Sequence, residues 1–148
     1  MANEIKTTKV TPELKSTMYK AGLVSSAAPL IIGILGLIIC SAAALDSMVT
    51  VCAIVTVVGV IMLAFHFYTA SVFCRTTVTV TDEGISGVCV SALFPVAAKS
   101  FSFKYSELET VAAPKPIGLI IRVAGKLYAV YTDEAKEVAA LILEKKGA

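Results

Sequence analysis

This chain of 148 residues carries 57% hydrophobic side chains and a mean hydropathy of +0.83, above the composition of about 45–50% apolar residues that is typical of soluble domains. Its net charge of +2 is too close to neutral to indicate a nucleic-acid partner. The four cysteines and the single histidine lack the spacing of a zinc site, so we expect free thiols in a reducing cytosol.

Residues 1–20 form a polar lead before the first apolar stretch. Thr11 followed by Pro12 is typical of a helix start, because threonine caps free N–H groups and proline suits the first helical position. We therefore expect a short interfacial helix from Pro12 to Lys20 that continues toward a membrane. The basic residues of the lead are Lys6, Lys9, Lys15 and Lys20.

Two apolar stretches follow, and Asp46 is the only charged residue between Ala21 and Cys74. Residues 21–45 and 48–74 each exceed the roughly 20 residues that a helix needs to cross a hydrocarbon core, so they predict a transmembrane hairpin. The first stretch resembles a signal peptide, but it is longer than the usual apolar region of roughly 7–15 residues and a second stretch follows at once. A retained anchor is therefore expected.

The placement of basic residues predicts the orientation of the hairpin. Lysines precede the first span and Arg75 follows the second, whereas the turn at Asp46 has no basic residue. Because basic residues concentrate on the cytoplasmic side of membranes, the sequence predicts a multi-pass protein of the plasma membrane with both termini in the cytoplasm.

Small residues recur on both predicted spans at alternating steps of four and three. This spacing places them along one side of a helix, and small residues let helix backbones approach closely in lipid. Two interpretations remain open, namely packing within one hairpin and an interface between several copies of the chain. This helix-packing seam comprises Gly22, Ser26, Pro29, Gly33, Gly36, Cys40 and Ala43 on the first span and Cys52, Thr56, Gly59 and His66 on the second.

His66 is the only histidine, and it falls within the second span. An ionisable residue inside a membrane is a functional-site hypothesis by default. A neutral histidine that bonds to the neighbouring helix would fit the same position. The sequence leaves structural packing and proton or ligand chemistry as the alternatives.

Residues 75–148 read as a small cytoplasmic α+β domain with about six strands. Residues 76–81 alternate polar and apolar side chains with the period of a half-buried strand. After a turn at Asp82–Gly84, further strands are expected over 85–90, 100–104, 110–113, 117–123 and 127–131, with a break at Pro114–Pro116. Thr132 then precedes an amphipathic helix that covers an open side of the sheet.

The segment after the second of these strands has no charge from Val88 to Ala98. If it is exposed, such an apolar patch marks a contact with a partner or a membrane. Burial beneath the closing helix is the alternative. The candidate contact residues are Leu93, Phe94, Pro95 and Val96.

Three stretches of the tail carry a resemblance to a known family. They are residues 80–85 (VTDEGI), residues 103–111 (FKYSELETV) and residues 133–138 (DEAKEV), the last of which follows a hairpin and opens the final helix. In this order they resemble the bacterial pleckstrin-homology-like (PH-like) domains. The resemblance covers about half of the chain and implies a partly open antiparallel barrel with a C-terminal helix. Members often follow one or two membrane helices.

The chain departs from that family in two respects. A full PH barrel has seven strands, so a count of about six leaves an edge open. Relatives that bind phosphoinositides carry basic residues around the first hairpin loop, whereas here the loop Thr81–Gly84 is acidic. Phosphoinositide binding by that route is therefore not expected.

No catalytic constellation emerges from the sequence, and we expect neither an enzyme nor a cofactor or metal site. The expected function is a membrane-anchored interaction or scaffold module that recruits a protein partner or associates with itself. An alternative is a small oligomeric transport or channel subunit, in which His66, Thr56 or Ser26 would face a path. A lesser alternative is anionic-lipid binding through scattered basic residues. These are Lys99, Lys104, Lys115, Arg122 and Lys126.

Overall fold

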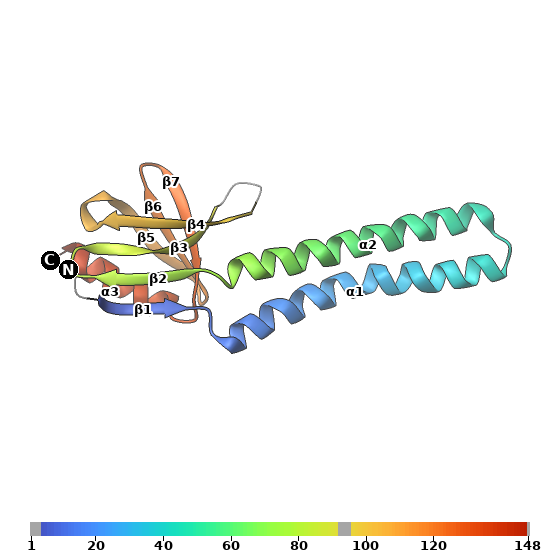
Figure 1. Ribbon diagram of the computed structural model, residues 1–148, viewed down its shortest axis with the longest axis horizontal. Coiled ribbons are helices and arrows are strands. Elements are labelled where there is room, and N and C mark those ends of the chain that lie inside the picture. Colours follow the sequence, from blue (N-terminus) through green and yellow to red (C-terminus); the bar gives the residue numbers. More distant parts are fainter. Residues whose placement is uncertain (1–3, 92–95, 148) are drawn as a thin grey trace. The chain divides into compact units, whose positions relative to one another are not determined.

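The computed structural model describes residues 4–91 and 96–147, and the chain divides into two compact units. The sheet unit consists of Met1–Lys15 together with Ser71–Ala148, and the helical unit consists of Ser16–Ala70. The sheet unit is therefore assembled from both ends of the chain (Figure 1).

Two helices account for the apolar half of the sequence. They are α1 (Pro12–Ala42) and α2 (Asp46–Phe73), and both are long and apolar enough to cross a membrane. The predicted pair of apolar helices is thus confirmed. The predicted start at Pro12 is also confirmed, with the Thr11 hydroxyl accepting a hydrogen bond of 3.3 Å from Leu14 N–H.

The boundaries of these helices differ from the prediction in two places. The expected interfacial helix and the first span form one continuous helix, which ends at Ala42 rather than at residue 45. The tight turn begins earlier because Ala44 takes a left-handed conformation with φ of 55°, which an α-helix cannot continue.

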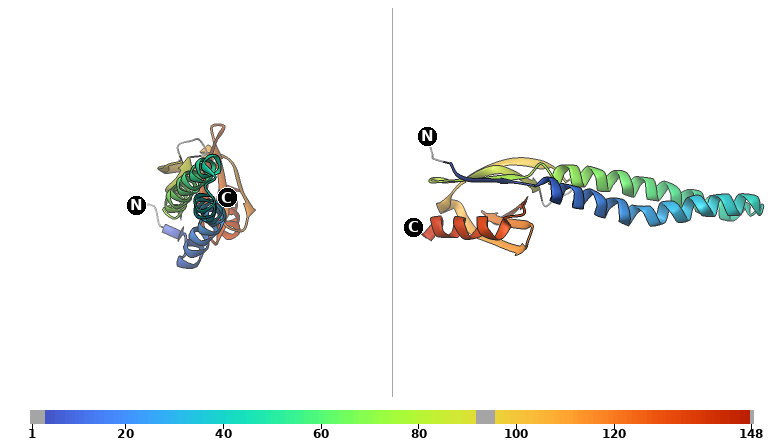
Figure 2. Two further views of the ribbon diagram at one scale, coloured as in Figure 1. Left: turned by 90° about the vertical axis from the view of Figure 1, so that its right-hand side faces the viewer. Right: turned by 90° about the horizontal axis from the view of Figure 1, so that it is seen from below.

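The sheet unit contains one antiparallel sheet that curls into a half-barrel, with helix α3 (Ala135–Gly147) against it (Figure 2). The strand order is β1-β2-β3-β7-β6-β5, and β4 pairs with β3. A single 3-10 turn, η1 (Tyr105–Glu107), joins β4 to β5. The strands are β1 (Glu4–Lys9), β2 (Thr77–Thr81), β3 (Gly84–Ser91), β4 (Ala98–Lys104), β5 (Leu108–Lys115), β6 (Gly118–Val123) and β7 (Lys126–Tyr131).

Strand β1 corrects the expectation of about six strands. It lies in the N-terminal lead, which the sequence analysis assigned to no sheet, and it pairs with β2 so that Lys9 is opposite Thr77. The sheet of the described residues therefore has seven strands. The strand was missed because Thr8 is the only buried residue among residues 5–9, so β1 lacks the apolar alternation that identifies a strand.

The interior of the half-barrel follows the predicted alternation. Val78 and Val80 of β2 are fully buried, whereas the threonines between them are half-buried. The predicted apolar face of α3 supplies Val138 and Ile142, both fully buried. The remaining core residues are Ile85, Cys89, Phe101, Leu108, Val111, Leu119, Ile121, Val130, Ala135 and Ala139.

Pro114 does not break the chain as predicted but lies inside β5. Strand β5 is at an edge of the sheet, where the missing N–H of proline costs no ladder hydrogen bond. The predicted turn between β6 and β7 is confirmed, and its two residues, Ala124 and Gly125, both have positive φ (48° and 73°), as the tight hairpin turn requires.

Both ends of the hairpin are tied to the corner between β7 and α3. After α2, the Thr76 hydroxyl accepts a hydrogen bond from Tyr131 N–H (3.0 Å) and lies 2.9 Å from the Tyr131 carbonyl oxygen. The Phe73 and Tyr131 rings stack with centroids 4.7 Å apart. Before α1, Thr11 N–H donates to Asp133 Oδ2 (3.3 Å). The β7–α3 corner therefore holds the chain at both junctions.

Lys6 adds an ionic link between β1 and α3. Its Nζ atom lies 3.0 Å from Glu134 Oε2 and 3.0 Å from Glu137 Oε2. One ammonium group thus contacts two carboxylates at the start of α3 and links the first strand of the chain to the last helix.

Replacing Thr76 by valine tests the junction after α2. Thr76→Val removes the acceptor for Tyr131 N–H, and we expect it to lower the free energy of unfolding of the sheet unit by about 1–3 kcal/mol. Thr77→Val is the matched control, because Thr77 is half-buried on the outer side of β2, and it should change stability by no more than about 0.5 kcal/mol. Thermal unfolding followed by circular dichroism measures both, and equal effects would contradict the assigned role.

Candidate functional site

The predicted helix-packing seam lies between α1 and α2 of the same chain. A Cβ atom added at Gly33 would lie 2.8 Å from Thr56 N and 3.0 Å from Thr56 Cα, closer than real side chains approach a backbone. At Gly36 it would lie 2.5 Å from Cys52 Sγ. The two helix backbones are therefore in close contact at Gly33, whereas Gly36 lies against the side chain of Cys52.

Some of the other seam residues contact the opposite helix, and others do not. Gly59 lies against Leu30, since an added Cβ atom would be 2.9 Å from Leu30 Cγ. Cys40 interacts with the Cys52 thiol near the turn of the hairpin. Pro29 is half-buried and Ala43 is exposed. The seam glycines thus lie against residues of the other helix of the same chain; an interface between several copies stays a prediction.

The outward surfaces of both helices are bulky and apolar. Few side chains of the apolar windows are buried within the chain. Many of the exposed side chains are large and aliphatic, as expected for helices that face lipid tails. The exposed positions include Leu23, Val24, Ile31, Ile32, Ile38, Ile39, Val51, Ile54, Val57 and Ile61.

His66 links the two helices through hydrogen bonds. Its Nδ1 atom lies 2.9 Å from the Met62 carbonyl oxygen and 3.0 Å from Ser26 Oγ, while Nε2 lies 3.4 Å from Ser25 Oγ. Ser26 is fully buried, and Gly22 makes room for the histidine, because an added Cβ atom would lie 3.0 Å from His66 Cβ. These contacts describe an interhelical polar link and fit the packing interpretation.

In the sheet unit, the outer edge of β4 has no strand partner among the described residues. Beside it, a shallow groove of about 370 Å³ crosses the paired ends of β3 and β4. Its lining includes the apolar residues Ile85 and Phe103 and the charged residues Glu83, Lys104 and Glu107. The groove is lined by Thr81, Glu83, Gly84, Ile85, Ser86, Ser102, Phe103, Lys104 and Glu107.

The carboxylates near this groove have structural partners. Glu107 Oε2 accepts a hydrogen bond of 2.7 Å from Lys104 N–H. Glu109 accepts from Gly125 N–H (2.9 Å) and pairs with Arg122 (3.2 Å). Across residues 4–91 and 96–147, no group of three His, Cys, Asp or Glu side chains is arranged to hold a metal ion.

Three titratable groups of the sheet unit have shifted pKa values. Burial raises the pKa of the Cys89 thiol, which is 1% exposed. Burial and the neighbouring Asp82 carboxylate raise the pKa of Tyr105, whose hydroxyl donates to the Thr81 carbonyl oxygen (2.6 Å). Hydrogen bonds to Glu134 and Glu137 raise the pKa of the Lys6 ammonium group. A protonated, buried Cys89 is a poor nucleophile.

The predicted partner-contact loop is only partly visible. Leu93, Phe94 and Pro95 lie outside the described residues, and Val96 is half-buried. The free edge of β4, which begins directly after this loop, was not singled out by the sequence. The sequence feature that could have indicated this free edge is the absence of a further strand pattern that could pair with residues 98–104.

No protein-family model matches the chain, and neither the curated proteins nor the solved structures contain a match to it.

A bulkier residue in the seam tests the contact between α1 and α2. Gly33→Val should force the helices apart at Thr56 and cost about 1–3 kcal/mol of packing free energy. Ala28→Val is the control, because Ala28 is an exposed position of the same helix. Oxidative cross-linking of Cys40 to Cys52, in a chain with Cys74→Ser and Cys89→Ser, should slow severalfold in the first variant only. Unchanged cross-linking in Gly33→Val would contradict the close contact.

The sheet unit should lose stability as the pH rises above about 8.5. Cys89, Tyr105 and Lys6 hold their protons more tightly in the folded state, so each contribution is complete below the ordinary pKa and is lost as pH rises through the folded value. Thermal unfolding between pH 7 and 11 measures this decline. Cys89→Ala should flatten its first part, and a melting temperature that does not change with pH would contradict the assignment.

Proposed function

We propose that this chain is a non-enzymatic, membrane-anchored interaction module with a PH-like sheet at the cytoplasmic face of the plasma membrane. The observation that carries the proposal is the connection of the hairpin to neighbouring strands. Strand β1 leads into α1 and β2 follows α2, and Lys9 is paired with Thr77. A hairpin whose two ends enter neighbouring strands of one sheet would attach that sheet to the membrane through two chain connections.

The bulky exterior of the helices supports the anchoring part of this proposal. The glycines are used inside the hairpin, and the exposed side chains are large and apolar. In water, such a surface would be an aggregation liability. In a bilayer, it is an ordinary lipid-facing surface.

The free edge of β4 supports the interaction part. An extended peptide can add a strand to an open sheet edge, with main-chain hydrogen bonds giving affinity and side-chain pockets giving specificity. The groove beside β4 would receive side chains of the added strand. Lys99 and Lys104 stand at the two ends of β4 and are exposed, which limits indiscriminate edge pairing and favours an acidic partner segment. Either a second copy or another protein can supply that strand.

Proline substitution in β4 tests the edge. Neighbouring residues of a strand direct their N–H groups to opposite edges, so one of Lys99→Pro and Ser100→Pro removes a donor from the free edge and the other breaks the pairing with β3. Circular dichroism identifies the variant that keeps the fold. In detergent, the parent chain should form a complex with itself or with a partner identified by mass spectrometry, and the folded variant should lose it.

The anchoring is measured separately by alkaline carbonate extraction of membranes. We expect the chain to stay in the membrane fraction. A chain that is extracted, or a folded proline variant that keeps the full complex, would contradict the corresponding half of the proposal.

A further inference from the structure

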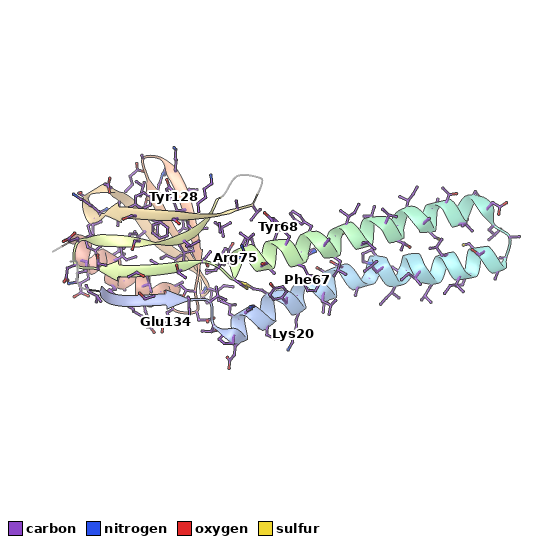
Figure 3. All side chains as sticks on the ribbon, viewed as in Figure 1. Lys20, Phe67, Tyr68, Arg75, Tyr128 and Glu134 are labelled. Atoms are coloured by element: carbon purple, nitrogen blue, oxygen red, sulfur yellow. The ribbon has the colours of Figure 1, made fainter. Side chains whose placement is uncertain are left out.

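Exposed basic residues gather at the end of the sheet unit from which the chain continues into the hairpin. Strand register defines this end: Lys9 pairs with Thr77, Lys99 lies opposite Cys89, and Lys115 pairs with Gly118, which pairs with Tyr131. Figure 3 shows Arg75 where α2 passes into β2. We call this set the basic rim; it consists of Lys9, Lys15, Arg75, Lys99, Lys115 and Lys136, all exposed.

The residues of the basic rim have no ion-pair partner among the described residues. The acidic residues at the same end are fewer than the basic ones; they are Glu13, Asp133, Glu134 and Glu137. Glu134 and Glu137 share Lys6, and Asp133 accepts the Thr11 N–H. An excess of positive charge therefore remains at this end.

The opposite end of the sheet unit is different. There Lys145 pairs with Asp82 (3.4 Å) and Arg122 pairs with Glu109 (3.2 Å), and the β2–β3 turn adds Glu83. Basic and acidic residues nearly balance at this end. The scattered basic residues of the sequence are thus divided by the fold, with Lys99 and Lys115 at one end and Lys104, Arg122 and Lys126 at the other.

The helical unit carries interfacial residues at its own open end. The Tyr19 and Phe67 rings lie 5.6 Å apart, and Phe65, Phe67 and Tyr68 are exposed. Aromatic side chains of this kind concentrate at the boundary between lipid tails and headgroups. Lys20 is exposed on α1 beside Tyr19. The ends of the two helices that connect to the sheet unit therefore carry residues typical of a membrane boundary.

We propose that the basic rim binds the phosphate-bearing headgroups of anionic phospholipids and so holds the sheet unit against the bilayer. The proposal rests on the membrane anchoring put forward above and names a second partner for the same module. Basic residues next to a membrane span are attracted to an anionic surface over roughly a Debye length. The acidic turn Thr81–Gly84, which argues against phosphoinositide binding, lies at the opposite end and does not oppose this contact.

The test uses the full chain in a neutral detergent, titrated with phosphatidylglycerol or, separately, with phosphatidylcholine. Binding to the folded state raises the melting temperature, which circular dichroism reports. We expect a rise with phosphatidylglycerol that is absent with phosphatidylcholine and is reduced by 0.5 M salt (roughly 4 Å screening length). Inorganic phosphate at the same concentration should not reproduce it.

Two double variants, each of which removes two positive charges, test where on the sheet unit the lipid headgroups bind. Lys99→Gln with Lys115→Gln removes two residues of the basic rim, whereas Lys104→Gln with Lys126→Gln removes one lysine from the far end of the same strand β4 and one from the β6–β7 turn. At about fivefold in affinity for each basic residue, the first pair should weaken the binding of phosphatidylglycerol by about 25-fold. The second pair should leave it within about threefold of the parent.

Equal losses in both double variants, or no loss in either, would overturn the proposal, as would a full response to inorganic phosphate. These outcomes are distinct from failure of the anchoring, which carbonate extraction reports, and from failure of partner recruitment, which the β4 variants report.

Discussion

The pairing of β1 with β2 is the constraint on which the rest of the molecule depends. It joins residues on the two sides of a long apolar hairpin, so that Lys9 and Thr77 are neighbours in one ladder. The contacts of Thr11 with Asp133 and of Thr76 with Tyr131 then hold both junctions at one corner of the sheet unit. The hairpin is therefore connected to the sheet unit by two adjacent strands, and both of these connections have hydrogen-bond partners within the sheet unit.

The glycine contacts bear on what the hairpin can do. A seam of small residues can join helices within a chain or between chains, and here Gly33 and Gly36 are occupied by Thr56 and Cys52 of the same chain. The polar atoms of the helices are likewise engaged, since His66 is bonded to Ser26 and to Met62. Assembly through the outward helix surface would have to rely on large aliphatic side chains, which pack less closely than glycine. Recognition is more readily placed in the sheet unit.

Much of the fold could be predicted from the sequence because its signals are local. Apolar length identified α1 and α2, threonine–valine alternation identified β2, and Thr132 preceded α3. Strand β1 could not be predicted, because its partner is about 70 residues away and its buried side chain is a threonine, Thr8. The prediction of a chain break at Pro114 was wrong for a similar reason. Only the strand order shows that β5 is an edge strand, which can contain a proline.

Less of the candidate sites than of the fold could be predicted from the sequence. His66 and the glycines could be named in advance, but which partner they contact is a property of the packed helices. Lys99 and Lys104 are five positions apart in one strand, and nothing local separates them. Their different surroundings follow from the direction of β4, which carries one toward the hairpin and the other away from it.

The pairing of β1 with β2 also constrains the order in which the chain can fold during synthesis. Strand β1 is synthesised first, but its partner β2 emerges only after the complete hairpin, so β1 has to wait unpaired while about 70 residues are added. For a chain inserted in a bilayer, the two strands can meet only if both helices have crossed and returned the chain to its starting side. A chain with one crossing would keep the edge of β2 open. In a membrane-inserted chain, completion of the sheet would therefore require both crossings.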